Sequence, residues 1–373
     1  MSAAASYDAI VIGAGMAGAS IAAELARDMS VLLVEMEDRP GYHATGRSVA
    51  FWSESYGGPY VQPLTRASLP FLDKPDPDFA ETGFLGARGA IHIGREGDEP
   101  LRDALMAQFA GTDIFRPLDA PALRQRVPGL RPEWTLGLEE PGVRDIDVAA
   151  LHAAYVRAFV RRGGEQALGL RFEHAVRQGD SWRVTLRDRE VKAGLIVNAA
   201  GAWADDVACA CAIRPLGIAP LLRTVVQLRL TPPVPFDLPL ILDLAENFYF
   251  KPVGDGRIWL TPHDERPVPA GDVAPEEIDV ALAIDRLQQV VDWRVDAVER
   301  KWAGLRSFAP DRLPVYGPDP DAPSFFWFAG QGGFGIQTAP AAAQLAHRLI
   351  CGGEDVPGID AATYLPTRFR DSA

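Results

Sequence analysis

The chain contains little cysteine. Cys209, Cys211 and Cys351 are the only three among 373 residues, an odd number with no C-x-x-C pair. This composition argues against a disulfide framework and against a zinc site. We therefore expect no metal and a reducing, cytoplasmic environment.

Long apolar runs and an excess of positive charge are also lacking. No stretch of about 20 uncharged apolar residues occurs, so we expect no integral membrane segment. The apolar N-terminus has no basic region and is interrupted by Asp8, unlike a signal peptide. A formal net charge of -13 argues against a nucleic-acid partner, although one or two local arginines could still hold a small anionic substrate.

The N-terminal 35 residues carry the clearest pattern. Short apolar runs at 8–12 and 31–35 flank a segment, 16–27, with apolar residues at helical spacing. Runs of this kind are typical of strands buried on both faces, so the pattern predicts a β-α-β unit in a parallel sheet.

A G-x-G-x-x-G motif lies between the first run and the helical segment. Gly13 permits a tight turn, Gly15 permits close approach of a pyrophosphate, and Gly18 permits close packing of helix and strand. Glu35 ends the second strand, where an acidic side chain accepts hydrogen bonds from ribose hydroxyls. The combination predicts binding of a dinucleotide, FAD or NAD.

Two further segments favour FAD. "GYHATGRSVAF" at 41–51 supplies an arginine and hydroxyls where an NAD domain would continue with another β-α unit. A second glycine run, "GQGGFGIQT" at 330–338, precedes an amphipathic helix. The positive N-terminus of that helix would stabilise the negative charge of a reduced flavin.

Segments typical of a parallel α/β domain alternate along the chain with segments typical of an antiparallel domain. We predict an α/β fold with a Rossmann-like FAD-binding domain and an interleaved α+β substrate domain built on an antiparallel sheet. The FAD domain comprises residues 1–50, 146–215 and 310–373, and the substrate domain comprises 51–145 and 216–309. A cofactor and a substrate would meet at the seam between them.

Six segments together resemble one family. The glycine motif, "YHATGRS", "VNAAGAWAD", "NFYFKP", "KWAGLRSF" and "GQGGFGIQT" occur in the order and at the distances seen in the D-amino-acid oxidase/glycine oxidase superfamily of flavoenzymes. Within that superfamily, the chain most resembles bacterial D-arginine dehydrogenases. The resemblance covers nearly the whole chain and implies FAD-dependent oxidation of a D-amino acid by hydride transfer from Cα to the flavin.

The resemblance also implies site residues. Arg306 and Tyr249 would clamp the substrate carboxylate, Arg223 would be a second substrate-side arginine, and the carbonyl of Gly304 would hold the amine. Further substrate-side positions are Gln337, Tyr56, Phe51 and Ala90. The predicted cofactor contacts are Gly13, Gly15, Met16, Ala17, Gly18, Glu35, Met36, Thr45, Arg47, Ser48, Val49, Ala50, Phe172, Ala200, Gly201, Trp203, Gly304, Arg306, Gly332, Gly333, Phe334, Gly335, Ile336 and Gln337.

The match to D-arginine dehydrogenases fails at the substrate side chain. Ala90 stands where they have an acid that holds the guanidinium, and Phe51 stands where they have a histidine. A buried cation without a partner is unfavourable, so we expect a neutral side chain against a wall of Phe51, Tyr56, Ala90, Leu240 and Leu242. "GLRSFAPDRL" contains no cysteine, so we expect noncovalent FAD.

Other functions stay open at this stage. The same clamp would suit a secondary or N-methyl amino acid or a 2-hydroxy acid, and either oxygen or a quinone could reoxidise the flavin. A non-catalytic flavoprotein, an RNA-modifying flavoprotein and an NAD-dependent dehydrogenase are the remaining alternatives. No Ser-His-Asp set is recognisable and the six histidines are scattered, although His43 lies in the predicted flavin loop.

Overall fold

The predicted β-α-β unit starts the fold. It consists of β1 (Ala5–Ile12), α1 (Met16–Leu25) and β2 (Val31–Val34). The computed structural model describes residues 5–187 and 189–369, so the outer ends of the predicted FAD domain, 1–4 and 370–373, lie outside the described residues.

A central group of parallel strands extends this unit. The order β9-β2-β1-β12-β20 places β1 in the middle. The antiparallel strand β11 pairs with one end of β12 and β10 pairs with β11, while β19 pairs with β20, which completes eight strands. The added strands are β9 (Glu165–Ala167), β10 (Phe172–Gln178), β11 (Ser181–Leu186), β12 (Arg189–Asn198), β19 (Val315–Pro318) and β20 (Phe325–Ala329).

Helices cover both faces of this sheet. On one face α1 packs against α5 (Val148–Arg161) and α8 (Gly335–Cys351), and on the other lie α6 (Ala204–Ala210) and the β10–β11 hairpin. Short 3-10 turns are η1 (Ala44–Arg47), η2 (Gly201–Trp203), η3 (Ala361–Tyr364) and η4 (Pro366–Phe369). Coverage on both faces explains why the strands are continuously apolar.

A second, ten-stranded sheet forms the other side of the molecule. Its strands are β5 (Ala90–Arg95), β6 (Arg116–Leu118), β7 (Trp134–Glu140), β13 (Ala219–Thr231), β14 (Leu240–Asp243), β15 (Tyr249–Gly254), β16 (Arg257–Thr261), β17 (Arg266–Pro267), β18 (Arg294–Phe308) and β21 (Gln331–Gly332). It is mostly antiparallel, as predicted. α3 (Glu99–Gln108), α4 (Ala120–Arg126) and α7 (Glu277–Val290) lie on this side, and one face of the sheet packs into its own apolar core.

One segment departs from the predicted domain division. α2 (Gln62–Asp73) packs against α8, and Leu64, Leu72, Phe79 and Phe84 belong to the same core as α1. Residues 52–84 therefore pack with the FAD-binding part, whereas we had assigned them to the substrate domain. Their apolar residues are spaced for burial, but the sequence does not say against which sheet. A three-stranded sheet joins the parts, with β3 (Phe51–Trp52), β4 (Leu85–Ala87) and β8 (Arg144–Ile146).

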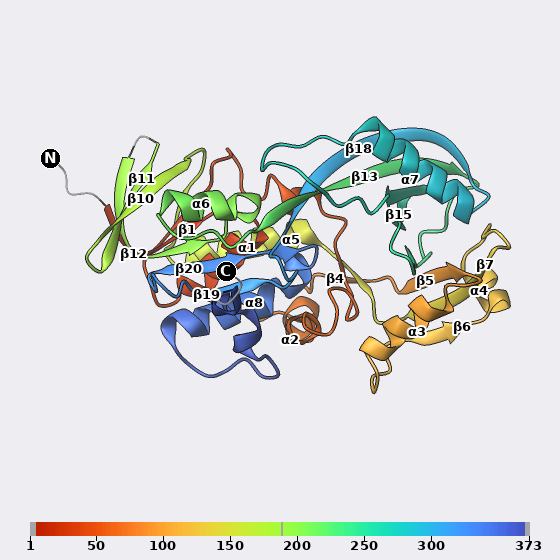
Figure 1. Ribbon diagram of the computed structural model, residues 1–373, viewed down its shortest axis with the longest axis horizontal. Helices are drawn as coiled ribbons and strands as arrows, with labels where there is room; N and C mark the ends of the chain where they lie inside the picture. Colours follow the sequence, from red (N-terminus) through yellow and green to blue (C-terminus); the bar gives the residue numbers. More distant parts are fainter. Residues whose placement is uncertain (1–4, 188, 370–373) are drawn as a thin grey trace.

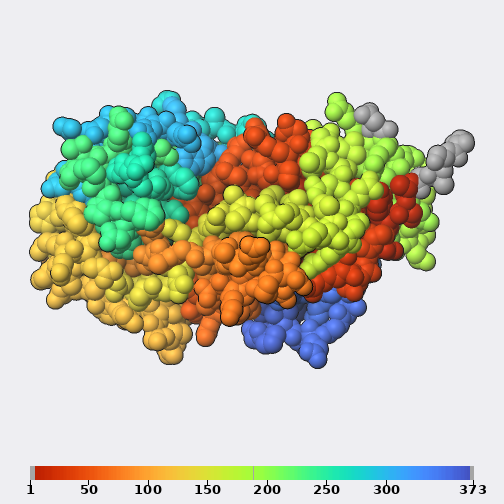
Figure 2. Space-filling view, turned by 180° about the vertical axis from the view of Figure 1, so that it is seen from behind, coloured from red at the N-terminus to blue at the C-terminus, as the bar shows by residue number. Residues whose placement is uncertain are grey.

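The two parts lie end to end in an elongated molecule. The parallel sheet occupies one end and the ten-stranded sheet the other, with β13 and β18 running from the middle into the second part (Figure 1). The view from behind likewise places the segment near residue 100 at one end, and the red segment near the start of the chain with the yellow-green segment near residue 180 at the other (Figure 2). Across residues 5–187 and 189–369, no helix has the length and apolarity needed to cross a membrane.

Candidate active site

A cavity of about 540 Å³ lies where the two parts meet. Its walls come from both glycine runs, the 41–49 loop, the β12–α6 connection and strands β13, β15 and β18. Twenty of the predicted cofactor positions line it: Gly13, Gly15, Met16, Ala17, Glu35, Met36, Thr45, Arg47, Ser48, Val49, Phe172, Ala200, Gly201, Trp203, Gly304, Arg306, Gly332, Gly333, Gly335 and Ile336. Gly18, Ala50, Phe334 and Gln337 are not part of the lining.

The first glycine turn packs tightly against the parallel sheet. Gly13 has a φ of +97°, and a Cβ there would lie 2.6 Å from the carbonyl oxygen of Ala199. A Cβ on Gly18 would lie 1.7 Å from the carbonyl oxygen of Gly13, so Gly18 serves helix packing rather than the cavity wall. The N-terminus of α1 thereby opens on the cavity, where it favours a phosphate.

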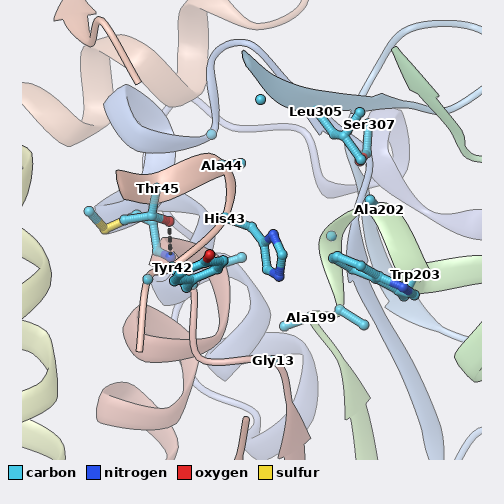
Figure 3. Close-up of a pocket in the computed structure, with 18 of the residues that line it drawn as sticks. Gly13, Tyr42, His43, Ala44, Thr45, Ala199, Ala202, Trp203, Leu305 and Ser307 are labelled. Atoms are coloured by element: carbon cyan, nitrogen blue, oxygen red, sulfur yellow. Dashed lines mark hydrogen bonds between the residues drawn. The ribbon is translucent and has the colours of Figure 1, made fainter. Parts of the chain in front are cut away.

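Glu35 and Thr45 hold this turn in place. The buried Glu35 carboxylate accepts a 2.8 Å hydrogen bond from the Ala14 amide. Thr45 Oγ1 accepts one of 2.9 Å from the Met16 amide (Figure 3). Both side chains also line the cavity. Glu35 therefore fixes the turn, and a hydrogen bond from its carboxylate to a ribose stays a prediction.

The 41–49 loop carries aromatic rings into the cavity. His43 lies between Tyr42 and Trp203, with ring centroids 4.9 and 4.8 Å away (Figure 3). Its Nε2 lies 2.8 Å from a Glu37 carboxylate oxygen. Sequence reasoning named His43 without a role, and the ring contacts that position it arise only in the folded chain.

Arg47 also lines the cavity, but its guanidinium forms hydrogen bonds to other residues of the protein. It donates hydrogen bonds to Asp272 Oδ1 at 2.5 Å and to the carbonyls of Ala303 and Val273 at 3.1 and 3.3 Å. These bonds fasten η1 to β18 and to the loop before α7. Any contact of Arg47 with a cofactor would involve the part of the side chain that faces the cavity.

The three residues that we predict to hold a substrate carboxylate, Arg306, Tyr249 and Arg223, all line the cavity, and this group is called the clamp below. An Arg306 Nη2 donates a 3.1 Å hydrogen bond to the Tyr249 hydroxyl, and both side chains line the cavity. Arg223 pairs with Gly304 across β13 and β18, which places it on the same sheet face as Arg306 two residues further along β18. The register of two long strands therefore brings the two arginines together.

Arg223 is only 4% exposed and has one free donor. Its Nε donates to the Asp264 carbonyl at 2.9 Å and one Nη donates to Glu265 at 3.0 Å. Among the described residues, nothing accepts a hydrogen bond from the other nitrogen, Nη1. A buried cationic donor without a partner is unfavourable, so this nitrogen is suited to an anionic ligand in the cavity.

Charges around the clamp shift neighbouring pKa values. Burial and the nearby Arg306 lower the pKa of Arg223 to about 10. Burial and both arginines lower the pKa of His263 to about 3, so this histidine beside Tyr249 stays neutral. The site therefore keeps two positive charges and no positive histidine at neutral pH.

Tyr56 closes the clamp from the side of the second glycine run. A Cβ on Gly333 would lie 1.9 Å from the Tyr56 hydroxyl and 3.0 Å from Arg306 Cζ, so glycine is needed for this approach. Burial raises the pKa of Tyr56, which keeps it a neutral hydrogen-bond donor. Tyr56 itself is not part of the cavity lining.

Gln337 lies behind the clamp, not in the cavity where we expected it. Its Oε1 accepts from the Ser53 amide at 3.0 Å, and its Nε2 donates to the Tyr56 carbonyl at 3.2 Å and to Thr65 at 2.9 Å. The side chain is 1% exposed. Gln337 thus positions the segment that carries Tyr56.

A buried carboxylate that sequence reasoning missed holds the same segment. Glu140 is 2% exposed and accepts hydrogen bonds from Ser53 Oγ at 2.9 Å and Ser55 Oγ at 2.6 Å. Burial alone would raise the pKa of Glu140, but the adjacent His92 ring and the two serines lower it. No local motif marks Glu140, because its two serine partners lie more than 80 residues away.

The residues that we predict to surround the substrate side chain pack against one another and do not face the cavity. Phe51, Ala90, Leu240 and Tyr249 form one apolar cluster, with Tyr56 and Leu242 against it. Of the wall we predicted, none of Phe51, Tyr56, Ala90, Leu240 and Leu242 lines the cavity. Whether such residues reach a cavity depends on packing between distant segments, which the sequence does not encode locally.

These features define a class of protein. Two helix N-termini, a buried acid after the second strand and a cavity of about 540 Å³ fit a flavin dinucleotide, and two buried arginines with a tyrosine in the same lining fit a carboxylate. The arrangement is that of a flavoenzyme acting on a carboxylate-bearing substrate.

Comparison with known proteins identifies the family. The profile of the family described as FAD dependent oxidoreductase (DAO) matches residues 8–349, and the chain belongs to this family. It is 28% identical to glycine oxidase from Pseudomonas aeruginosa, over 96% of this chain and 98% of that protein. The enzyme is therefore an FAD-dependent oxidoreductase acting on amino acids, and the prediction of FAD is confirmed.

Solved structures confirm the fold. L-proline dehydrogenase from P. horikoshii superposes with a TM-score of 0.85 at 19% identity, covering 99% of both chains. Glycine oxidase from Geobacillus kaustophilus superposes with a TM-score of 0.83 at 21% identity, covering 98% of this chain and 99% of that one. At these identities the likeness supports the architecture.

Proposed function

We propose that the enzyme oxidises a D-amino acid with a neutral side chain to its imino acid, which then hydrolyses in water to a 2-oxo acid. The observation that carries the proposal is the clamp of Arg306, Tyr249 and Arg223 at one end of the cavity. It offers a planar carboxylate two guanidinium groups, one with an unpartnered buried nitrogen.

The clamp orients the substrate. A carboxylate between Arg306 and Arg223 would accept charge-assisted hydrogen bonds from both, and the Tyr249 hydroxyl would donate a third. The carbonyl of Gly304, the residue opposite Arg223 in the β13–β18 pair, would accept from the substrate amine. Fixing carboxylate and amine together fixes the direction of the Cα hydrogen, which is the positional part of catalysis.

When bound, FAD would supply the chemistry, as the acceptor of the Cα hydride. The chain's own part is to hold the amine neutral and the carboxylate fixed. Two positive arginines near the substrate favour loss of the amine proton, and no protein base is required. His263 is unsuited to that role, because its pKa of about 3 leaves it a weak base and its Nδ1 contacts the Glu246 carbonyl.

The second glycine run would stabilise the reduced cofactor. Gly335 begins α8 and lines the cavity with Gly332 and Gly333. The positive end of this 17-residue helix lies at the cavity wall, where it would favour negative charge on a reduced flavin held in the cavity. Gly333, just before α8, lies against Arg306 of the clamp. The regions that would bind the cofactor and the substrate are therefore neighbours in the cavity.

The groups around Ala90 support the proposal that the side chain of the substrate is neutral. Glu140 is opposite Ala90 in the β5–β7 pair, so a carboxylate does lie nearby. Its oxygens, however, are engaged by Ser53 and Ser55. A guanidinium or ammonium group would have to break these bonds, so we expect D-arginine and D-lysine to be poor substrates.

A secondary or N-methyl amino acid is the second candidate, and a 2-hydroxy acid would fit the same clamp. The tight packing of Phe51, Tyr56 and Ala90 leaves little room for a large side chain. The names of the similar proteins, glycine oxidase and L-proline dehydrogenase, add a small and a cyclic secondary amino acid to the substrates worth testing.

Anaerobic bleaching of the flavin tests the proposal. The purified enzyme would be mixed with D-methionine, D-leucine, D-phenylalanine, D-arginine and D-lysine, each with its L-enantiomer, and with glycine, sarcosine, L-proline and D-lactate. The proposal expects fastest reduction by a neutral D-amino acid. Fastest reduction by sarcosine, proline or lactate would replace it with the second candidate, and fastest reduction by D-arginine would refute the side-chain assignment.

The electron acceptor is a separate proposal. Oxygen or a quinone would reoxidise the flavin, and stopped-flow mixing of reduced enzyme with each would distinguish an oxidase from a dehydrogenase. A cytoplasmic location, expected from the few cysteines, remains a prediction.

A further inference from the structure

A cluster of metal-ligating side chains lies on the surface, outside the active site. Asp28 follows α1, and His347 and Cys351 occupy the last turns of α8. One ligand atom from each lies within 4.8 Å of the other two. His347 and Cys351 are four residues apart, so they share one face of the helix.

Existing contacts already gather the ligand atoms. His347 Nε2 lies 2.7 Å from Asp28 Oδ2, and Cys351 Sγ lies 3.9 Å from the thioether sulfur of Met29. The cluster therefore offers oxygen, nitrogen and sulfur ligands from two segments, and Met29 adds a second sulfur beside them.

We propose that Asp28, His347 and Cys351 bind Zn²⁺ or a similar borderline-soft divalent cation. Carboxylate, imidazole and thiolate are the ligands that zinc takes in proteins. Metal–ligand bonds of about 2.0–2.3 Å place tetrahedral ligand atoms roughly 3.3–3.8 Å apart, so a shift of about 1 Å in side-chain positions closes the site. Water or Met29 would complete four ligands.

Local electrostatics favour a cation at this point. The C-terminal ends of α1 and α8, which carry partial negative charge, both lie beside the cluster. Partial burial and the Asp28 carboxylate raise the pKa of the Cys351 thiol. The raised pKa favours the protonated thiol, whereas a bound metal ion would favour the thiolate. The S–H bond breaks, the proton goes to solvent, and a sulfur–metal bond forms.

The site would join two helices that serve the cofactor. α1 and α8 pack together, and the first residue of each helix, Met16 and Gly335, lines the cavity. A metal ion would link their opposite ends. From the sequence we expected no zinc site, because no C-x-x-C pair is present. The sequence could not indicate this cluster, because Asp28 and His347 are separated by 319 positions.

Calorimetric titration with ZnCl₂ tests the proposal, on the FAD-bound enzyme with its cysteine thiols kept reduced. We expect one site with a Kd of about 1 μM or tighter, and proton release seen as a dependence of the heat on buffer ionisation. Cys351→Ser and His347→Gln should each weaken binding at least tenfold. Cys209→Ser, which removes the other exposed cysteine, is the matched control and should bind as wild type does.

X-ray absorption at the zinc edge gives an independent readout. The proposal expects one sulfur or more at about 2.3 Å and loss of that shell in Cys351→Ser. Binding that survives Cys351→Ser unchanged, a zinc shell without sulfur, or a wild-type Kd weaker than about 100 μM would overturn it. Neither measurement depends on which amino acid the enzyme oxidises.

Discussion

Gly333→Ala is the sharpest test of the clamp geometry. The added methyl would lie 1.9 Å from the Tyr56 hydroxyl, whereas ordinary contacts begin near 3.4 Å, so the hydroxyl must move by about 1.5 Å. The same methyl would lie 3.0 Å from Arg306 Cζ and press on the guanidinium. Relief by backbone movement would displace the start of α8 instead.

The expected loss is large for one methyl group. A misplacement of about 1 Å at a reacting centre can reduce the rate by about a hundredfold. We therefore expect kcat/KM of Gly333→Ala to fall by roughly that factor, which corresponds to about 3 kcal/mol of transition-state stabilisation. FAD content should stay near that of wild type, because the first glycine turn is untouched.

Three measurements distinguish this outcome from general damage: the flavin-to-protein absorbance ratio, the rate of anaerobic flavin reduction, and the Kd of a carboxylate ligand such as benzoate. Gly86→Ala is the matched control, since its added methyl would meet only Asp145 Cβ at 3.9 Å. If Gly333→Ala keeps kcat/KM within twofold of wild type, Tyr56 and Arg306 do not form the substrate end of the site.

Four further predictions follow from the same contacts. Arg306→Lys should raise KM about 10- to 100-fold with a smaller change in kcat, as steady-state kinetics would show, because an ammonium cannot reproduce the bidentate fork. Glu140→Gln should raise KM about tenfold by loosening the Tyr56 segment; Glu139→Gln, the same change one residue away at a side chain paired with Arg126, should leave KM within twofold. Stability should fall as pH drops from 6.5 towards 3, because unfolded His263 takes up a proton that the folded site refuses. Thermal unfolding of His263→Asn should show a weaker pH dependence over that range, and an unchanged slope would remove His263 as its cause. Acid precipitation should leave all flavin in the supernatant, whereas yellow protein would contradict noncovalent binding.

The sequence by itself determined the cofactor end of the site. Gly13 and Gly18 are needed where a strand turns tightly into a helix, and the apolar runs around them reflect burial on both faces. Such signals are local, since they depend on residues within one β-α-β unit. The parallel sheet, the first glycine turn and the acid at its second strand could therefore be predicted in place.

Only the tertiary structure decided the substrate end. Arg223 and Arg306 meet because of the β13–β18 register, and Gln337 faces away from the cavity because Ser53, Tyr56 and Thr65 offer it partners. Residue identity specifies what a side chain can bind, but the partner it meets depends on packing between segments distant in the chain.

The same reason explains the remaining differences. Glu140 is opposite Ala90 through strand pairing, residues 52–84 pack with α8, and Asp28 meets His347 across the ends of two helices. Each contact joins residues that carry no mutual signal in the sequence, because side-chain contacts across elements are fixed only when strand register and helix packing are fixed.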